Sequence, residues 1–233
     1  MTASEILPIL EERIGYHFRD SSLAISAMTH PSFMNEMKIN KWDHYQRLEY
    51  LGDAVLELTM SEYLYFKYPT MPEGELSKLR ASMVCEPALA FCANNLNLGE
   101  LILLGKGEDL CGGRKRDSIL SDVFEAVIGA IYLDGGMDCA KSHVNRFVID
   151  GMGERILFTD SKSILQEEVQ KTPGRVIRYE LISEEGPEHD KRFTVALFID
   201  EVKKAEACGH SKKNAEQKAA YNVLKEMGVS RNL

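Results

Sequence analysis

The chain has 233 residues, of which 44% are hydrophobic and 27% are charged. This composition is typical of a globular protein and excludes fibrous and low-complexity classes. No apolar run approaches the ~20 residues that a membrane-spanning helix needs, and Glu5, Glu11 and Glu12 stand where a signal peptide would be basic. The five cysteines include no CxxC pair. We therefore expect no disulfide framework and a cytoplasmic protein.

The net charge of −8 is unevenly distributed along the chain. Residues 160–233 contain 13 basic and 13 acidic residues, whereas residues 1–159 contain 15 basic and 23 acidic ones. Such asymmetry predicts two domains with different roles. Any affinity for nucleic acid must then come from a local basic patch rather than from the net charge.

The first 152 residues predict an all-α domain, because apolar residues recur there at helical spacing and no alternating β-branched run interrupts them. The predicted helices are residues 4–15, 50–68, 74–84, 87–97, 118–134 and 137–148. The Gly-rich or charged segments 97–100, 105–117 and 134–136 are expected to be loops. Pro69 is expected to end the second helix, and residues 153–160 are expected to form a linker.

The pattern changes after residue 160. Residues 162–170 predict a short helix and residues 212–228 a second one. Between them, the predicted strands are residues 175–183, 191–200 and, with weaker alternation, 201–209. The residues of the last helix that should face inward are Ala215, Ala219, Ala220, Val223, Leu224 and Met227. The order α-β-β-β-α over residues 161–230 predicts a small α+β domain, with one antiparallel sheet and two helices on one face.

Two acidic pairs give the clearest functional signal. Glu49 and Asp53 are four residues apart, a spacing that puts two side chains on one face of a helix. Asp122 and Glu125 are three apart, again on one face. A single pair of this kind is usually a solvated surface. Both pairs, however, are embedded in apolar helices, where like charges are costly unless a cation compensates them. Oxygen ligands favour Mg²⁺ or Mn²⁺, so the spacing predicts a candidate metal site. The small residues that would let the two helices approach closely are Gly52, Ala126, Gly129 and Ala130.

Four blocks of the sequence resemble the ribonuclease III family, in the bacterial order and with the family's spacing. The blocks are AMTHPSF (27–33), RLEYLGDAVLEL (47–58), MPEGELSKLRA (71–81) and GKGEDLCGGRKRDSILSDVFEAVIGAIYLDGG (105–136). The resemblance continues into the C-terminal part, which is similar to a double-stranded-RNA-binding domain. It implies an endonuclease domain over residues 1–152, the linker, and an RNA-binding domain over residues 161–230. It also implies a homodimer that cleaves double-stranded RNA with Mg²⁺, for which Mn²⁺ can substitute, leaving 5′-phosphate and 3′-hydroxyl ends. Precursor ribosomal RNA and structured messenger RNA are the implied substrates, and neither a membrane nor an organic cofactor is implied.

The resemblance also implies roles for individual residues of the nuclease domain. Glu49, Asp122 and Glu125 fall on metal ligands, and Asp53 and Glu125 on catalytic positions. Glu73 falls on an accessory acidic position.

Three further residues of this domain have other implied or possible roles. Tyr50 falls on an anchor of the dimer interface, where the family usually has Phe. Gln46 stands where the family often has Glu, so a charge is lost and the position is treated as accessory. His30 could suggest a nucleophilic mechanism, but a hydrogen-bonded structural role is the simpler interpretation.

The implied RNA contacts lie in three segments of the C-terminal domain. They are Gln166 and Glu167 on the first helix, Pro187 and His189 in the first loop of the sheet, and Ser211, Lys212 and Lys213 at the start of the last helix. Two lysines at a helix N-terminus oppose the helix dipole, so they are either a solvated charged end or a phosphate site. His189 could equally be an ordinary exposed loop residue, and Ser211 is also the expected N-cap.

Two other functions compete with a nuclease. A non-cleaving RNA-binding relative could keep both folds, but it need not keep all four carboxylates, which this chain has. A metal-dependent phosphohydrolase acting on nucleotides would leave the C-terminal domain unexplained.

Overall fold

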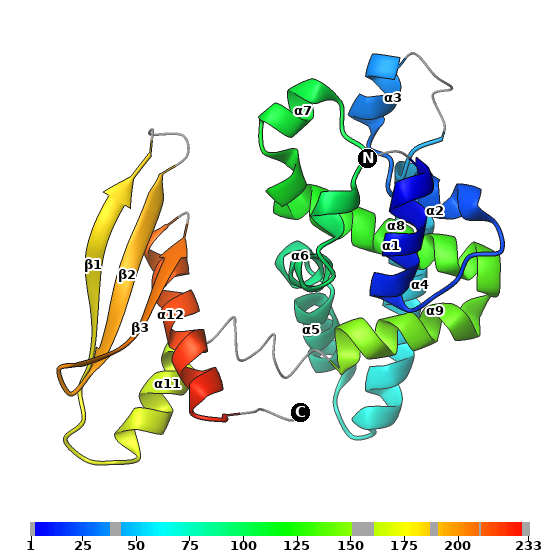
Figure 1. Ribbon diagram of the computed structural model, residues 1–233. Coiled ribbons are helices and arrows are strands. Elements are labelled where there is room, and N and C mark those ends of the chain that lie inside the picture. Colours follow the sequence, from blue (N-terminus) through cyan, green and yellow to red (C-terminus); the bar gives the residue numbers. More distant parts are fainter. Residues whose placement is uncertain (1–2, 38–42, 151–160, 187–190, 210, 230–233) are drawn as a thin grey trace. The chain divides into compact units, whose positions relative to one another are not determined.

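In the computed structural model, helix α8 (Asp117–Gly135) is the packing centre of an N-terminal unit that spans residues 1–151 (Figure 1). The helices that pack against it are α2 (Ser21–Ala27), α4 (Gln46–Lys67), α6 (Glu86–Asn95) and α9 (Met137–Val144). Its fully or almost fully buried side chains include Ile119, Leu120, Val123, Phe124, Val127, Ile128 and Ile131. Because most of its surface is buried, this helix is apolar around most of its circumference.

The structure describes residues 3–37, 43–150, 161–186, 191–209 and 211–229. The expected linker, residues 153–160, lies outside these ranges. Within them, no helix is both long enough and apolar enough to cross a lipid bilayer.

The secondary structure in the described remainder of the N-terminal unit is helical apart from one isolated bridge between Thr29 and Leu103, which confirms the predicted all-α class. The remaining helices are α1 (Ala3–Ile14), α3 (Pro31–Met37), α5 (Glu73–Met83), the 3₁₀ turns η1 (Leu98–Leu101) and η2 (Gly113–Lys115), and the short helix α7 (Lys106–Leu110). The prediction of a loop over residues 105–117 was therefore wrong in part, because α7 and η2 lie within it. Arg114 stabilises this segment: its guanidinium binds the Asp109 carboxylate at 2.7 Å and donates to the carbonyl oxygen of Ile102 at 2.8 Å. These contacts form only in the folded chain, so no periodic pattern in the sequence could indicate them.

Two helix ends differ from the prediction by four residues. Helix α4 begins at Gln46, four residues before the predicted start, and ends at Lys67, just before Pro69 as expected. Helix α9 ends at Val144 and continues as a π-helical turn over Asn145–Ile149. The early start of α4 matters for function because it places Glu49 within the helix.

The C-terminal unit, residues 152–233, contains one three-stranded antiparallel sheet with the strand order β1-β2-β3. Its elements are α11 (Ser161–Gln170), β1 (Ile177–Glu185), β2 (Arg192–Ile199), β3 (Val202–Gly209) and α12 (Lys212–Glu226). Both helices pack on one face of the sheet, which confirms the predicted α-β-β-β-α fold (Figure 1). The core between the layers is formed by Ile164, Leu165, Val169, Leu197, Ile199, Ala219, Ala220, Val223 and Leu224.

Met227 departs from the expected inward face of the last helix. It is 47% exposed, because α12 ends at Glu226 and Met227 is its C-cap residue. The other five residues expected on that face are buried.

Candidate active site and RNA-binding surface

Helices α4 and α8 cross in backbone contact at two glycines. A Cβ atom on Gly52 would lie 1.8 Å from the carbonyl oxygen of Glu125. One on Gly129 would lie 2.2 Å from the carbonyl oxygen of Leu48. Neither position has room for a side chain, so these glycines allow the closest approach of the two helices. The expected role of small residues at this crossing is confirmed for Gly52 and Gly129.

This crossing brings acidic side chains from the two helices together. One carboxylate oxygen from each of Glu49, Asp122 and Glu125 lies within 4.8 Å of the other two. All three side chains are half-buried. Asp53 is exposed and is not a member of this three-carboxylate group, although its charge acts on both Glu49 and Glu125.

The three-carboxylate group holds protons more tightly than isolated carboxylic acids do. Burial, and then repulsion from Asp122 and Asp53, raise the pKa of Glu49 to about 7. Burial and then the repulsion of the other acidic groups, Asp53 first, raise the pKa of Glu125 to about 8. Burial also raises the pKa of Asp122, against the opposing effect of a hydrogen bond from the Tyr45 hydroxyl.

A divalent cation fits this donor set. The three side chains offer only oxygen atoms, which Mg²⁺ and Mn²⁺ prefer. A cation among them would offset the repulsion that raises the pKa values, and its binding would release protons. Cation affinity should therefore increase with pH.

Three other predicted residues of this unit are not members of the three-carboxylate group. Glu73 begins α5, where it is exposed and accepts a hydrogen bond from the Ser77 hydroxyl at 2.9 Å. Gln46 is the exposed first residue of α4. Tyr50 is 81% exposed and therefore has no need of a buried hydroxyl partner within a single chain.

Tyr50 belongs to an exposed apolar stripe along α4. Ala54 and Leu58 follow it at intervals of four residues, and Leu58 is 56% exposed. Residues at this spacing lie on one face of a helix. Exposed aromatic and aliphatic side chains in a row are typical of a surface that another protein chain covers.

His30 has the structural role that was expected of it. Its Nδ1 accepts a hydrogen bond from the backbone N–H of Ser32 at 3.0 Å, and its carbonyl oxygen accepts one from the N–H of Phe33. Both contacts stabilise the start of α3.

The sequence interpretation missed Tyr45, whose hydroxyl donates to Asp122 at 3.1 Å. The available signal was a tyrosine one helical turn before Glu49.

In the C-terminal unit, the start of α12 is an exposed cationic surface. Ser211 is the N-cap, as predicted, because its hydroxyl accepts a hydrogen bond from the N–H of Asn214 at 3.1 Å. Lys212 and Lys213 are exposed. Neither lysine forms a salt bridge with another described residue. The Lys212 ammonium lies 5.9 Å from the centre of the Phe193 ring. Both lysines are nevertheless exposed beside the helix N-terminus, an arrangement that suits phosphate.

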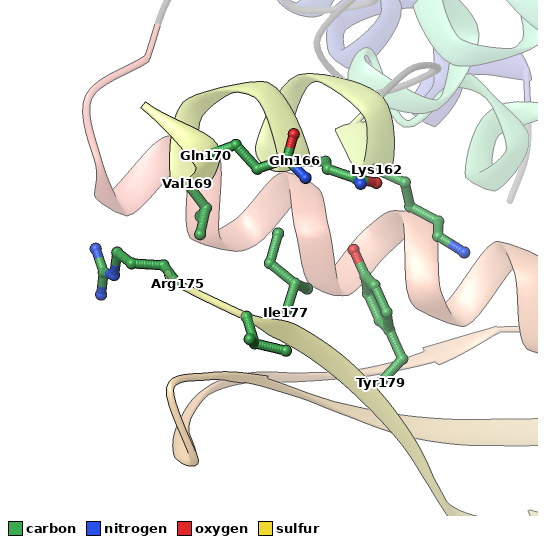
Figure 2. Close-up of a pocket in the computed structure, with 8 residues that line it drawn as sticks. Lys162, Gln166, Val169, Gln170, Arg175, Ile177 and Tyr179 are labelled. Atoms are coloured by element: carbon green, nitrogen blue, oxygen red, sulfur yellow. The ribbon is translucent and has the colours of Figure 1, made fainter. Parts of the chain in front are cut away.

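Gln166 and Glu167 are exposed on α11. Gln166 lines a hollow of about 320 Å³ between α11 and β1, which also contains Lys162, Arg175 and Tyr179 (Figure 2). Both cations of this hollow are paired with acids: Lys162 with Glu216, and Arg175 with Asp200. The hollow thus has little free positive charge, and phosphate contacts are better supported at α12. Pro187 and His189 lie outside the described residues, and their roles stay predictions.

Comparisons with known proteins agree with this arrangement. Residues 20–152 match the family model described as Ribonuclease-III-like, and residues 161–227 match the one described as double-stranded RNA binding motif. The chain is 46% identical, over 225 residues, to Ribonuclease 3 of Bacillus cereus strain AH187, covering 96% of this chain and 92% of that protein. Ribonuclease 3 of Bacillus anthracis strain CDC 684 gives the same identity and coverage.

A solved structure is similar to the N-terminal unit. The nuclease domain of ribonuclease III from Campylobacter jejuni, described for flexibility in a region involved in dimer formation, is 44% identical. The match covers 62% of this chain and 96% of the chain in that structure, with a TM-score of 0.58. With two matched domains in one order, this chain belongs to the ribonuclease III family and is an endoribonuclease specific for double-stranded RNA.

Proposed function

We propose that the chain hydrolyses both strands of double-stranded RNA with Mg²⁺, or Mn²⁺ in its place, and leaves 5′-phosphate and 3′-hydroxyl ends. The observation that carries this proposal is the three-carboxylate group at the crossing of α4 and α8. Structured precursors of ribosomal and messenger RNA are the proposed substrates, because a double-stranded-RNA-binding domain recognises A-form shape largely without sequence preference.

The residues divide into two roles. Glu49, Asp122 and Glu125 would hold the cation through their carboxylate oxygens. When bound, the cation lowers the pKa of water and stabilises charge on the attacking and leaving oxygens of the phosphodiester. Asp53, exposed one helical turn after Glu49, would accept a hydrogen bond from the attacking water and orient it. Glu73 would add negative charge at the periphery without binding the cation.

A homodimer is part of the proposal. The stripe of Tyr50, Ala54 and Leu58 lies on the helix that carries Glu49 and Asp53. Pairing two copies through this stripe would cover exposed apolar surface. A two-fold dimer would also give one catalytic centre for each strand of the duplex.

A labelled perfect duplex tests the proposal directly. We expect cleavage of both strands with Mg²⁺ and none in EDTA, because the carboxylates alone cannot stabilise the charge that develops at phosphorus. End-group analysis should find a 5′-phosphate or a 3′-hydroxyl at every end that cleavage creates. Binding of the duplex without any cleavage, at any Mg²⁺ or Mn²⁺ concentration, would instead favour a non-cleaving RNA-binding protein.

Replacing Lys212 and Lys213 together by Ala should weaken duplex binding equally for unrelated sequences. Each lysine that neutralises a phosphate releases condensed counterions, so the slope of log K against log salt should become shallower by about two. Binding titrations at several salt concentrations measure this slope. The matched control is the double Ala variant of Lys203 and Lys204 on β3, which should keep the wild-type slope. An unchanged slope in the first variant would remove these lysines from the RNA contact.

A further inference from the structure

Tyr45 is buried directly beside the three-carboxylate group. It is 3% exposed and immediately precedes α4. Its hydroxyl donates a hydrogen bond to the Oδ2 atom of Asp122 at 3.1 Å. Its carbonyl oxygen accepts the backbone N–H of Glu49 at 2.8 Å. One residue thus contacts members of the group on both helices.

The backbone of Tyr45 is fixed from the opposite side. Its N–H donates to the carbonyl oxygen of Thr29 at 3.0 Å, and its ring meets the His30 ring edge-on, with 5.6 Å between centres.

The segment that provides these contacts is itself fixed. Thr29 forms a parallel bridge with Leu103, and the N–H of His30 donates to the Leu103 carbonyl oxygen at 3.0 Å. The N–H of Leu103 in turn donates to the carbonyl oxygen of Met28 at 2.8 Å. This segment is part of the AMTHPSF block, residues 27–33, which contributes no member of the three-carboxylate group.

These contacts connect the block to the proposed metal site. Asp122 is a short side chain that faces the like charges of Glu49 and Glu86. Without a bound cation, repulsion would favour rotation of its carboxylate away from Glu49. A hydrogen bond from a rigidly held phenol opposes that rotation.

We propose that Tyr45 is a positioning residue, which orients the Asp122 carboxylate for cation binding and is itself held by residues 28–30. This inference rests on the proposed function, since it requires Asp122 to be a ligand. Tyr45 touches neither the RNA nor the cation in this role. It acts only through Asp122.

The same chain offers a matched control. Tyr16 also donates its hydroxyl to a carboxylate, that of Asp134, at 2.7 Å. This pair is in the same unit but shares no residue with the three-carboxylate group. Tyr16→Phe and Tyr45→Phe therefore remove the same kind of hydrogen bond, and only the second is expected to change cation binding.

The test is a titration of the full-length protein with Mn²⁺ alone, in which electron paramagnetic resonance measures the free ion. Tyr45→Phe should raise the Kd for Mn²⁺ about 10-fold, the usual cost of losing a group that orients a metal ligand. Tyr16→Phe should leave the Kd unchanged. In an Asp122→Ala background, Tyr45→Phe should have no further effect, because the two residues act as a unit. Thermal unfolding of each variant confirms that the measured protein is folded.

The outcomes separate this inference from the proposed function. If Glu125→Gln loses Mn²⁺ binding but Tyr45→Phe keeps the wild-type Kd, the role of Tyr45 is refuted and the metal site stands. An effect of Tyr45→Phe that persists in the Asp122→Ala background would equally refute it. If Glu125→Gln binds Mn²⁺ as the wild type does, the proposed metal site itself is wrong.

Discussion

Glu125→Gln should reduce Mg²⁺-dependent cleavage of long duplex RNA by about 10³-fold, the upper range for removing one group that stabilises transition-state charge. Within the three-carboxylate group, Glu125 has the largest number of acidic neighbours that raise its pKa. They include Asp53, Asp122 and Glu49. The amide keeps the shape of the side chain but removes the charge that is proposed to hold the cation. Single-turnover cleavage of an end-labelled duplex at saturating protein measures the loss.

Duplex binding by the same variant should stay close to that of the wild type. The proposed phosphate contacts lie on the C-terminal unit, and the Glu→Gln change leaves α12 unaltered. Binding is measured in EDTA, so that cleavage does not interfere. The control is Glu100→Gln. Glu100 is an exposed glutamate that lies, like Glu125, in the N-terminal unit, and it pairs with Arg13. Full cleavage by Glu125→Gln, with Glu100→Gln also active, would refute the site assignment.

Gly52→Ala should damage both stability and catalysis. The new methyl group would lie 1.8 Å from the Glu125 carbonyl oxygen, which is backbone and cannot rotate away. The helices must separate, and overpacking of this kind costs about 1–3 kcal/mol of the free energy of unfolding. A displacement of about 1 Å between groups that share one cation can lower the rate by about 10²-fold. Chemical denaturation and single-turnover cleavage measure the two effects.

Gly74→Ala is the matched control. Gly74 lies within α5, and a Cβ atom there would meet nothing within 4 Å. Ala is the better helix former, so this variant should be as stable as the wild type or up to about 1 kcal/mol more stable. If Gly52→Ala were also fully stable and active, the close backbone crossing would not be what positions the carboxylates.

The sequence by itself determined the classes of the two units and the chemical types at the site, but not the helices α2, α3 and α7. Helical and alternating periods separate an all-α unit from an α+β unit, because these periods record which face of each element is buried. Two acidic pairs in apolar helices pointed to an oxygen-only cation site. The grouping of Glu49, Asp122 and Glu125 as proposed ligands already follows from the resemblance of local blocks.

Only the tertiary structure decided how these parts meet. Sequence spacing predicts that the two members of each acidic pair lie on one face of a helix. It does not predict the distance between α4 and α8. That distance depends on backbone contact at Gly52 and Gly129. The same crossing leaves Asp53 outside the three-carboxylate group. In the sequence, Asp53 is spaced from Glu49 much as Glu125 is from Asp122, so spacing alone could not make this distinction. The position of Tyr45 one helical turn before Glu49 was visible in the sequence, but its contact with Asp122 was not. Its hydroxyl reaches Asp122, 77 residues away, and a contact of that range produces no local period.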